Sequence, residues 1–486
     1  MSDELPQGWA SAPMKEIAEI NPRHPKGLED VMPVTFVPMA GLSESKPDFQ
    51  FTEQRPLGEV RKGFTHFAEG DVLFAKITPC MENGKGAVAR GLQNKLGCGT
   101  TELHVIRPSG GIIPEYIYRF LAQPLVRRAA KENFTGTAGQ ARVPTSFIEE
   151  LEIPLAPLAE QRRIVAKLEK LLGQVDACQG RLARIPALLK RFRQAVLAAA
   201  CSGRLTADWR EARSAPSAPL REEKESRRGA EGAENLPDDR RNTQFQIAQS
   251  EDELPELPET WTWVALGNYA RCLRGRFSPR PRNDPQYFNG KHPFIQIGNL
   301  PREGGLVSSH VQTLNDEGLV VSRKFPKGTV VIAIVGATIG NTGVLAYDMC
   351  VTDSIVGLET GDELGNRYVE LFLRHKKDDI RQISYSSGGQ PNINLATLNP
   401  YPLALPPLAE QQEIVRRVEG LFTLADQLEL RLAQARGQMD KLTPALLARA
   451  FAGQLVPQDP ADEPADKLLE RIHAQSESKS CQDARK

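Results

Sequence analysis

The chain has 486 residues, of which 40% are hydrophobic and 25% charged, and its 61 basic and 61 acidic side chains give a formal net charge of zero. Because domains usually run about 50 to 250 residues, this length excludes a single hydrophobic core and predicts at least two. A net charge of zero argues neither for nor against a nucleic-acid partner, so local clusters of charge must decide.

The chain begins MSDELPQGWA, which is acidic and polar, whereas a signal peptide is basic and then apolar. No apolar run reaches the roughly 18 residues that a membrane span needs. We therefore expect a cytoplasmic protein with no membrane partner. The seven cysteines form no C-x-x-C pair, so neither a zinc site nor a disulfide framework is indicated.

Two regions of the chain have mixed character. Strand-like runs (GDVLFAKI from Gly70 and GTVVIAIVGAT from Gly328) precede helix-like segments (PEYIYRFLAQPLVRRAAKE from Pro114 and NRYVELFLRHKKDDIRQI from Asn366), with many Gly and Pro turns between them. Between the two regions, the stretch from Glu211 is rich in Ala, Pro, Glu and Arg and has almost no aliphatic periodicity. This composition is typical of a solvated linker.

Each mixed region is followed by a segment with heptad spacing, which predicts a long helix. Each helix should begin after a proline (Pro157, Pro407) and end near a glycine (Gly203, Gly453), and Pro186 and Pro444 should kink or break it. Such a pattern favours packing against a partner helix, although each helix could instead pack only on its own domain. The predicted helix interface consists of Ile164, Leu168, Leu171, Val175, Leu182, Ile414, Val418, Leu421, Leu428 and Leu432.

The two helical segments are copies of one another. PLAEQRRIVAKLEKLL begins at Pro157 and PLAEQQEIVRRVEGLF at Pro407, and the match holds without a gap from Leu155 to Leu205 at an offset of 250 residues. The simplest pairing runs the two helices antiparallel, because the second mixed region lies between the end of one and the start of the other. The predicted fold class is therefore α+β: two mixed α/β domains separated by a pair of long antiparallel helices, a coiled-coil spacer, in a pseudo-two-fold internal repeat.

The clearest local cluster of charge is RCLRGRFSPRPR, which carries Arg271, Arg274, Arg276, Arg280 and Arg282, no acid, and Phe277 among them. Arginine forks suit phosphates and guanine edges, and a Gly- and Pro-rich loop lets the backbone approach a duplex. An exposed basic loop without a ligand is the alternative. The corresponding stretch of the first region, NPRHPKG, is a weaker candidate and contributes Arg23 and Lys26.

Catalytic motifs are missing from the sequence. It contains no G-x-x-x-x-G-K-[ST] phosphate loop, no H-E-x-x-H and no G-x-S-x-G. LNPYP from Leu398 is similar to a methyltransferase element but lacks its second proline, and we interpret it as a turn before a strand. The histidines show no ligand spacing, so we expect no catalytic residue and no metal site.

Several of these features together resemble the specificity subunit of type I restriction-modification systems. They are the Pro-Leu-x-Glu-Gln helix starts, the Gly-Gln elements before them (GTAGQ, SSGGQPNINL), GRLTADWR from Gly203 and the tail from Ala452. The resemblance implies the following segments: 1–153, target-recognition domain 1; 154–206, spacer helix 1; 207–254, linker; 255–403, target-recognition domain 2; 404–456, spacer helix 2; 457–486, tail.

The resemblance implies a non-catalytic subunit that binds double-stranded DNA and reads a bipartite sequence. Its protein partners would be two methyltransferase subunits and, where DNA is cleaved, two restriction subunits. The chain itself would hold no cofactor: S-adenosylmethionine would belong to the methyltransferase, and ATP and Mg would belong to the motor-nuclease. Two alternatives are a coiled-coil scaffold that does not bind DNA, and a stand-alone methyltransferase or nuclease, against which the missing motifs argue.

Overall fold

The computed structural model describes residues 5–136, 141–214, 244–249, 253–385 and 392–483. The chain forms two compact units: unit 1 comprises Met1–Ala183 and Leu432–Lys486, and unit 2 comprises Arg184–Arg431. Each unit therefore contains one mixed region and part of each long helix. The GTAGQ and SSGGQ elements and most of the predicted linker lie wholly or largely outside the described residues.

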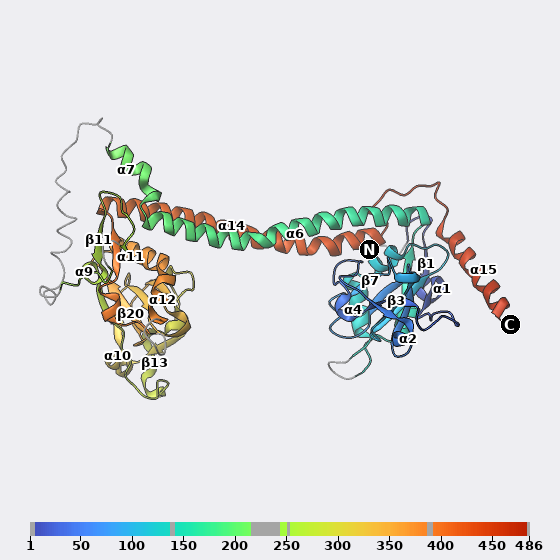
Figure 1. Cartoon of the computed structure of the whole chain (residues 1–486), viewed down its shortest axis with the longest axis horizontal. Coiled ribbons are helices and arrows are strands. Elements are labelled where there is room, and N and C mark those ends of the chain that lie inside the picture. The colour runs from blue at the N-terminus through green and yellow to red at the C-terminus, as the bar shows by residue number, and fades with distance from the viewer. Residues whose placement is uncertain (1–4, 137–140, 215–243, 250–252, 386–391, 484–486) are drawn as a thin grey trace. The chain divides into compact units, whose positions relative to one another are not determined.

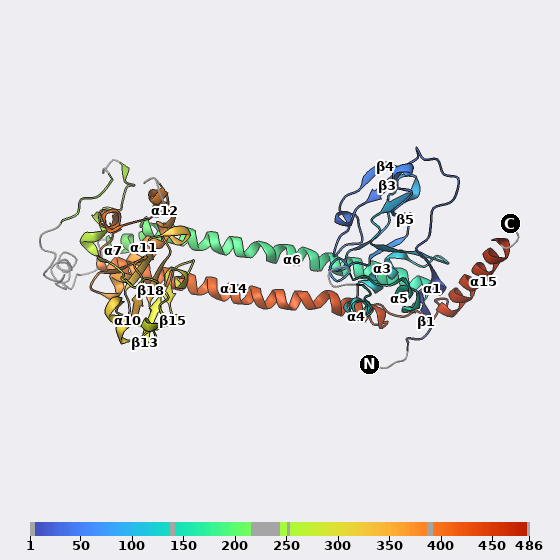
Figure 2. The same cartoon turned by 90° about the horizontal axis from the view of Figure 1, so that it is seen from below.

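Unit 1 contains three antiparallel or mixed sheets, with strand orders β1-β10, β2-β9-β6-β7 and β4-β3-β8-β5. The β4-β3-β8-β5 sheet lies farther from helix α6 than helices α3 and α5 do (Figure 2). The strands of unit 1 are β1 (Ala10–Pro13), β2 (Ala18–Ile20), β3 (Pro33–Val37), β4 (Glu53–Pro56), β5 (Thr65–Ala68), β6 (Val72–Ala75), β7 (Gly86–Val88), β8 (Leu96–Gly99), β9 (Leu103–Pro108) and β10 (Glu152–Leu155). Its shorter helices are α1 (Met14–Ile17), α2 (Leu57–Val60), α3 (Pro114–Leu121), α4 (Pro124–Glu132), α5 (Thr145–Glu150) and, near the C-terminus, α15 (Ala465–Asp483).

Unit 2 repeats this topology (Figure 1). The orders β11-β21, β12-β20-β17-β18-β14 and β15-β13-β19-β16 match those of unit 1 strand for strand, with β14 added, and β13–β19 is a parallel pair like β3–β8. The strands are β11 (Thr262–Ala265), β12 (Arg271–Arg274), β13 (Phe288–Ile295), β14 (Leu306–Val307), β15 (Gln312–Leu314), β16 (Arg323–Phe325), β17 (Val330–Ala333), β18 (Thr342–Leu345), β19 (Met349–Val351), β20 (Ile355–Glu359) and β21 (Pro402–Leu405). The shorter helices are α7 (Ala207–Ser214), α9 (Leu266–Tyr269), α10 (Asp316–Val321), α11 (Glu363–His375), α12 (Lys377–Tyr385) and α13 (Leu395–Leu398).

The two long helices are α6 (Leu158–Cys201) and α14 (Leu408–Phe451), each of 44 residues. As predicted, each starts directly after its proline, and Gly203 and Gly453 follow it with φ of +75° and +68°. That left-handed backbone suits a glycine that ends a helix. The prediction of a break is wrong, because both helices run through Pro186 and Pro444 without interruption.

The two helices pair antiparallel within each unit. In unit 2, Arg193 of α6 contacts Asp426 and Glu429 of α14 at 2.5 and 2.6 Å. Beyond the end of α6, Asp208 of the following segment pairs with Arg417 of α14 at 2.7 Å. This contact is nearer the start of α14 than the contacts of Arg193, as an antiparallel pair requires. In unit 1, Ile164 and Leu168 share a core with the last turns of α14. The pairing predicted from chain order is therefore present.

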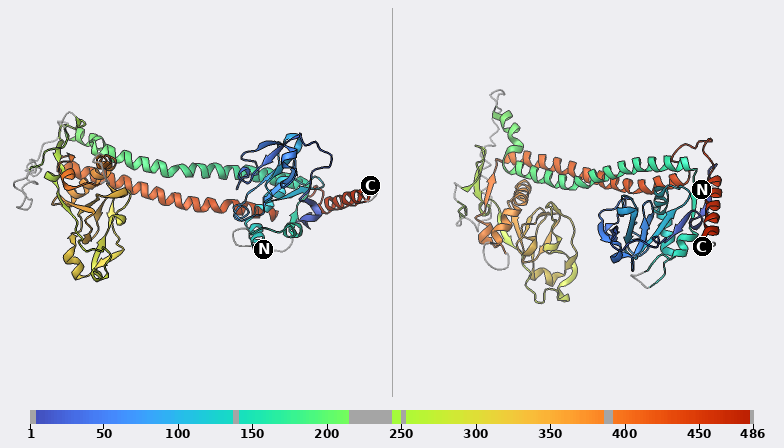
Figure 3. Two further views of the ribbon diagram at one scale, coloured as in Figure 1. Left: turned by 60° about the horizontal axis from the view of Figure 1, so that its bottom comes forward. Right: turned by 45° about the vertical axis from the view of Figure 1, so that its right-hand side comes forward.

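A short strand pair fixes the start of each long helix. In unit 1, β1 pairs with β10 so that Ala10 lies opposite Leu155, and in unit 2 β11 pairs with β21 so that Thr262 lies opposite Leu405. The core of unit 1 continues from β1 and β10 into the first turns of α6 and into α15. In the right-hand view of Figure 3, α15 is the red helix beside the N-terminal domain. None of the described helices combines the length and apolar character needed to cross a membrane.

Candidate nucleic-acid interface

The arginine segment of unit 2 occupies β12 and the loop that leads to β13. Arg274, Arg276, Arg280 and Arg282 are exposed, and Arg271 is partly buried on the strand. The carboxylate of Asp353 contacts two of the four exposed arginines: Arg282 donates to both of its oxygens at 2.8 and 2.9 Å, and Arg280 lies 3.6 Å from it. The segment therefore keeps a local excess of positive charge.

Backbone carbonyls hold several of these guanidinium groups in place. Arg274 donates to the Asp353 carbonyl at 2.6 Å, Arg276 to the Val320 carbonyl at 2.8 Å, and Arg280 to the Pro279 carbonyl at 2.7 Å. A guanidinium group has five donors in a fixed fork, so one bond to a carbonyl leaves others free to face outward. The arrangement orients cations on a surface loop, which is what contact with phosphates requires.

Phe277, the aromatic residue within this segment, lies in the core. Its side chain is 2% exposed and packs against Tyr287, Phe288 and Phe294, with its ring centroid 4.9 Å from that of Phe294. It anchors the loop from below and is not available to stack on a base. The alternation of Arg and Phe in the sequence did not distinguish these two roles.

The weaker segment of unit 1 lies at the equivalent place, between β2 and β3. Arg23 and Lys26 are exposed there, and His24 between them turns inward and stacks on His66 with ring centroids 4.5 Å apart. His24 Nε2 lies 3.0 Å from the Gly97 carbonyl. Burial and the neighbouring His66 lower the pKa of His24 to about 4. The topology thus brings the two basic segments, which share no sequence, to matching positions.

The residues of the predicted helix interface differ in burial. Ile164, Leu168, Val175, Ile414, Val418 and Leu432 are buried, Leu171, Leu182 and Leu421 are partly buried, and Leu428 is 41% exposed. In unit 1, Ile164 and Leu168 pack both on the mixed domain and on Leu447 and Phe451 of α14. The start of α6 therefore shares a core with its own domain and with the last turns of α14.

The repeated Glu-Gln pair at the start of each helix is buried and ties the helix to its surroundings. Gln161 donates to the Ala156 carbonyl and Gln411 to the Pro406 carbonyl, both at 2.9 Å. Glu160 accepts from Trp9 Nε1 at 3.1 Å, and Glu410 accepts from Arg210 and from Thr206. The sequence revealed the repeat of this pair, but its role in joining helix to domain required the structure.

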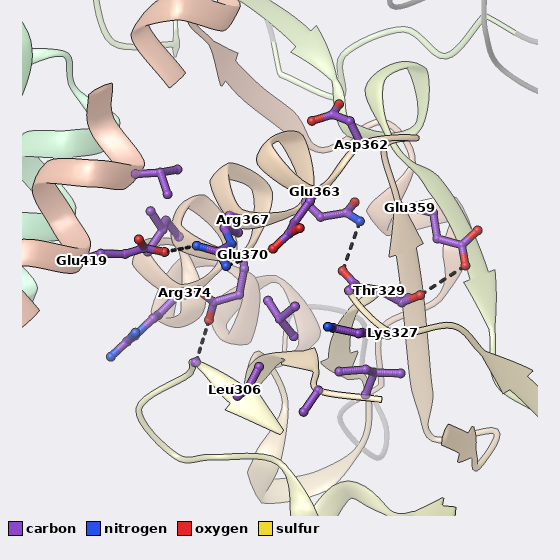
Figure 4. A pocket seen from close by; sticks show the side chains of 18 of the residues that line it. Leu306, Lys327, Thr329, Glu359, Asp362, Glu363, Arg367, Glu370, Arg374 and Glu419 are labelled. Atoms are coloured by element: carbon purple, nitrogen blue, oxygen red, sulfur yellow. Dashed lines mark hydrogen bonds and ion pairs between the residues drawn. The ribbon is translucent and has the colours of Figure 1, made fainter. Parts of the chain in front are cut away.

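An open pocket of about 1000 Å³ lies in unit 2 between the mixed domain and the first turns of α14 (Figure 4). Three of its charged groups form ion pairs, since Arg367 pairs with Glu363 at 2.9 Å and with Glu419 at 2.5 Å, and the guanidinium of Arg374 lies 4.8 Å from the centre of the Phe422 ring. Glu370 accepts from the backbone of the loop before β14. The pocket is therefore a polar junction between domain and helix.

Metal chemistry has no candidate centre among the described residues, where no three His, Cys, Asp or Glu side chains gather to hold an ion. His24 and Cys98 come within 3.5 Å of one another, but burial raises the pKa of the Cys98 thiol to about 12 and so disfavours its thiolate. The six cysteines whose side chains are described are free thiols.

Comparison with known proteins identifies the family to which the chain belongs. The model of the type I restriction modification DNA specificity domain matches residues 6–187 and 258–434, that is, both mixed regions and the larger part of each helix. The chain belongs to this family. The EcoEI specificity subunit of Escherichia coli is 30% identical over 515 aligned residues, which cover 92% of this chain and 83% of that protein.

Two solved structures share the fold. One, from a study of complex assembly and conformational transition in a type I R-M system, has a TM-score of 0.64 at 20% identity and covers 93% of this chain and 99% of its own. The other, the HsdS subunit from Thermoanaerobacter tengcongensis, has a TM-score of 0.60 at 20% identity with the same coverage. Type I specificity subunits are non-catalytic, and the catalytic activities lie in partner subunits. The expectation of a non-catalytic chain is thereby confirmed.

Proposed function

We propose that this specificity subunit recognises a bipartite sequence in double-stranded DNA. Target-recognition domain 1 (1–153) would read one half and target-recognition domain 2 (255–403) the other. The observation that carries this proposal is the repeated topology, which presents a basic segment at the same place in two domains of different sequence. Equivalent folds with different surface residues suit two different half-sites.

The repeated helices serve as the scaffold in this proposal. Since the two helix starts share their sequence and the same buried hydrogen bond from Gln161 or Gln411 to a backbone carbonyl, we expect them to present similar outer faces to two methyltransferase subunits. Restriction subunits would join where the system cleaves DNA. S-adenosylmethionine would be bound by the methyltransferase, and ATP and Mg by the motor-nuclease, all acting on DNA in the cytoplasm.

The direct test is to sequence DNA methylation in cells that make the chain together with its methyltransferase, and in cells that lack the chain alone. A split methylated sequence that depends on the chain is the expected result. Its absence, with both proteins expressed, would favour a scaffold that does not bind DNA. Methyl transfer by the purified chain alone would instead point to a stand-alone methyltransferase.

A second test removes single charged side chains from the purified complex of this chain with its methyltransferase. Arg282→Gln should weaken binding to a duplex that carries the recognised sequence and should leave the complex assembled, because Arg282 is exposed and contacts only Asp353 among the described residues. Arg471→Gln is the matched control, since Arg471 is a similarly exposed cation that donates to both carboxylate oxygens of Glu463. Loss of assembly in the Arg282 variant would mean that the loop is a protein interface.

A further inference from the structure

Arg127 of α4 is a partly buried cation that no carboxylate compensates. Its Nε is fully buried without a hydrogen-bond partner, and among the described residues no acidic side chain pairs with it. Burial lowers the pKa of Arg127, and the Tyr118 hydroxyl is the one neighbour that opposes this effect. A cation held out of water without a partner costs stability, so proteins seldom keep one that serves no purpose.

The backbone around Arg127 is shaped to receive it. Its guanidinium lies directly on Gly84, at the turn between β6 and β7, where a Cβ would overlap the guanidinium atoms. Gly84 has φ of +86°, which favours glycine. Lys85 follows at once, and Lys85, Gly86, Tyr118 and Arg127 line one shallow pocket.

Unit 2 has a different cation next to the equivalent turn. The strand registers make Gly340, at the turn between β17 and β18, the equivalent of Gly84, and it too has a positive φ, +79°. Lys377, the first residue of α12, packs on it through its backbone and the base of its side chain: a Cβ on Gly340 would meet the Lys377 carbonyl oxygen at 3.0 Å and its Cγ at 3.1 Å. Lys377 donates to the Arg302 carbonyl at 2.9 Å and has no ion pair among the described residues.

The ligand class follows from charge and size. The pocket beside Arg127 holds only about 10 Å³, so a base or a sugar cannot enter it, whereas a small anion could meet the guanidinium at its rim. Lys85 also lines this pocket; its ammonium donates to the Met39 carbonyl at 3.3 Å and has two further N–H donors. Arginine forks bind phosphate oxygens in pairs, and a glycine turn lets a backbone approach closely. The recurrence in both recognition domains matches a ligand that both must bind.

We propose that Arg127 with Lys85 in unit 1, and Lys377 in unit 2, bind backbone phosphates of the DNA duplex. The sites rest on the proposed function and add to it. They position each domain on the duplex, while the basic segments before β3 and β13 supply other contacts. Phosphate contacts fix register and carry no sequence information. Their loss should therefore weaken cognate and non-cognate binding alike.

The test measures duplex binding by the complex of this chain with its methyltransferase across a range of salt concentrations. For Arg127→Gln, we expect the slope of log Kd against log salt to fall by about 0.9, the value for one phosphate contact, with the ratio of cognate to non-cognate affinity unchanged. Arg90→Gln removes the same charge from an exposed pair with Glu115 in the same unit and should leave the slope unchanged. Lys377→Gln should behave like Arg127→Gln.

Thermal unfolding without DNA separates this role from a structural one. Because Arg127 is uncompensated, Arg127→Gln should not lower Tm; an unchanged salt slope overturns the proposal whatever the Tm. If slope and Tm both fall, Arg127→Lys decides: a restored slope supports a phosphate contact, and a slope that stays low overturns it. Failure of the unmodified complex to bind DNA in a salt-dependent way would count against the proposed function itself.

Discussion

A stacked pair of imidazoles lies beneath the basic segment of unit 1, and it should make stability depend on pH. The pKa of His24 is lowered to about 4 by burial first and then by His66, Arg107 and Arg61, while the Gly97 carbonyl opposes the shift. The folded state therefore keeps His24 neutral between pH 6.5 and 4, where the unfolded chain binds a proton. Stability should fall as pH drops through that window and should fall no further on this account below about pH 4.

The variant His24→Gln removes this dependence. Its Tm should lie below that of the unmodified chain at pH 7.5, because contacts with His66 and Gly97 are lost, and the difference should shrink or reverse at pH 5. Measuring Tm at several pH values checks this, and the value at pH 7.5 isolates the loss of contacts. If the Tm of the two proteins changes with pH in the same way, the protonation of His24 is not linked to folding.

Single residues mark the limit of what the sequence could reveal. The exposed arginines from Arg274 to Arg282 could be predicted, because a basic stretch without acidic residues can be recognised from the sequence alone. Phe277 and His24 lie in the same segments, but their inward orientation depends on packing against Phe294 of β13 and against His66, which the composition of the segments does not reveal. The sequence does not single out Arg127, because it is one of several charged residues in α4. Its contact with Gly84 is visible only in the structure.

At the scale of elements, the long helices show how a proline is accommodated. Pro186 has no N–H, so the Leu182 carbonyl, four residues earlier in α6, lacks its helical donor. Arg436 of α14 donates to that carbonyl at 3.1 Å. The sequence predicted a kink or break because proline is costly within a helix. The donor that offsets the loss comes from a helix about 250 residues away, so no local pattern could reveal it.

A double-mutant cycle tests this compensation. Arg436→Ala should cost about 0.5–1.5 kcal/mol of unfolding free energy, the usual net worth of one hydrogen bond, and the loss should be near the lower end because the bond is exposed. In a Pro186→Ala background the Ala N–H satisfies the Leu182 carbonyl, and Arg436→Ala should then cost close to nothing. Denaturant unfolding of the four proteins gives the coupling. Equal costs in both backgrounds would contradict it.

The heptad pattern predicts the long helices well but not which of their faces is covered. Leu428 and Leu432 are one turn apart in α14, yet Leu428 is 41% exposed and Leu432 only 7%. Periodicity identifies an apolar stripe, whereas burial depends on how far the partner helix and the domains reach along it.

The two leucines therefore make a matched pair for truncation. Leu432→Ala should destabilise the chain by about 2–3 kcal/mol through lost packing and a residual cavity, and Leu428→Ala by less than about 1 kcal/mol. The midpoint of denaturant unfolding measures both. Equal losses would mean that the exposed face of α14 at Leu428 is covered by another contact.

At the scale of the whole molecule, the internal repeat explains which predictions succeeded. An offset of 250 residues and antiparallel helices could be inferred because the helices kept their sequence. The repeat of the sheets was visible only in fragments, since a sheet tolerates any apolar residues that alternate correctly. The similarity of FAEGDVLFA from Phe67 and FPKGTVVIA from Phe325 already relates β6 to β17. The equivalence of Gly84 with Gly340 follows only from the strand registers, because the turns that lead to β7 and β18 differ in length.

Each recognition domain has cores of its own, and this allows the domains to be exchanged. Clusters around Val37 and Phe36 lie within domain 1, and those around Ile295 and Phe277 within domain 2. The larger core of unit 1, however, also uses α14 and α15, where Phe451 lies 4.9 Å from Tyr116 by ring centroids. An exchanged domain must therefore keep an aromatic residue at that position and the Trp9 donor for Glu160.

Replacing 1–153 with the corresponding domain of another type I specificity subunit should change one half of the recognised sequence and leave the other half as it was. The reason is that the sheets and basic segment of domain 2 stay intact while the helix starts keep their buried partners. Sequencing of methylated DNA from cells that carry the hybrid and the same methyltransferase gives both halves at once. The point variant Tyr116→Ala of the unmodified chain should assemble poorly, which controls for loss of docking. A change in both halves would show that the two domains do not read the DNA independently, and the separation of their cores would then have no counterpart in recognition.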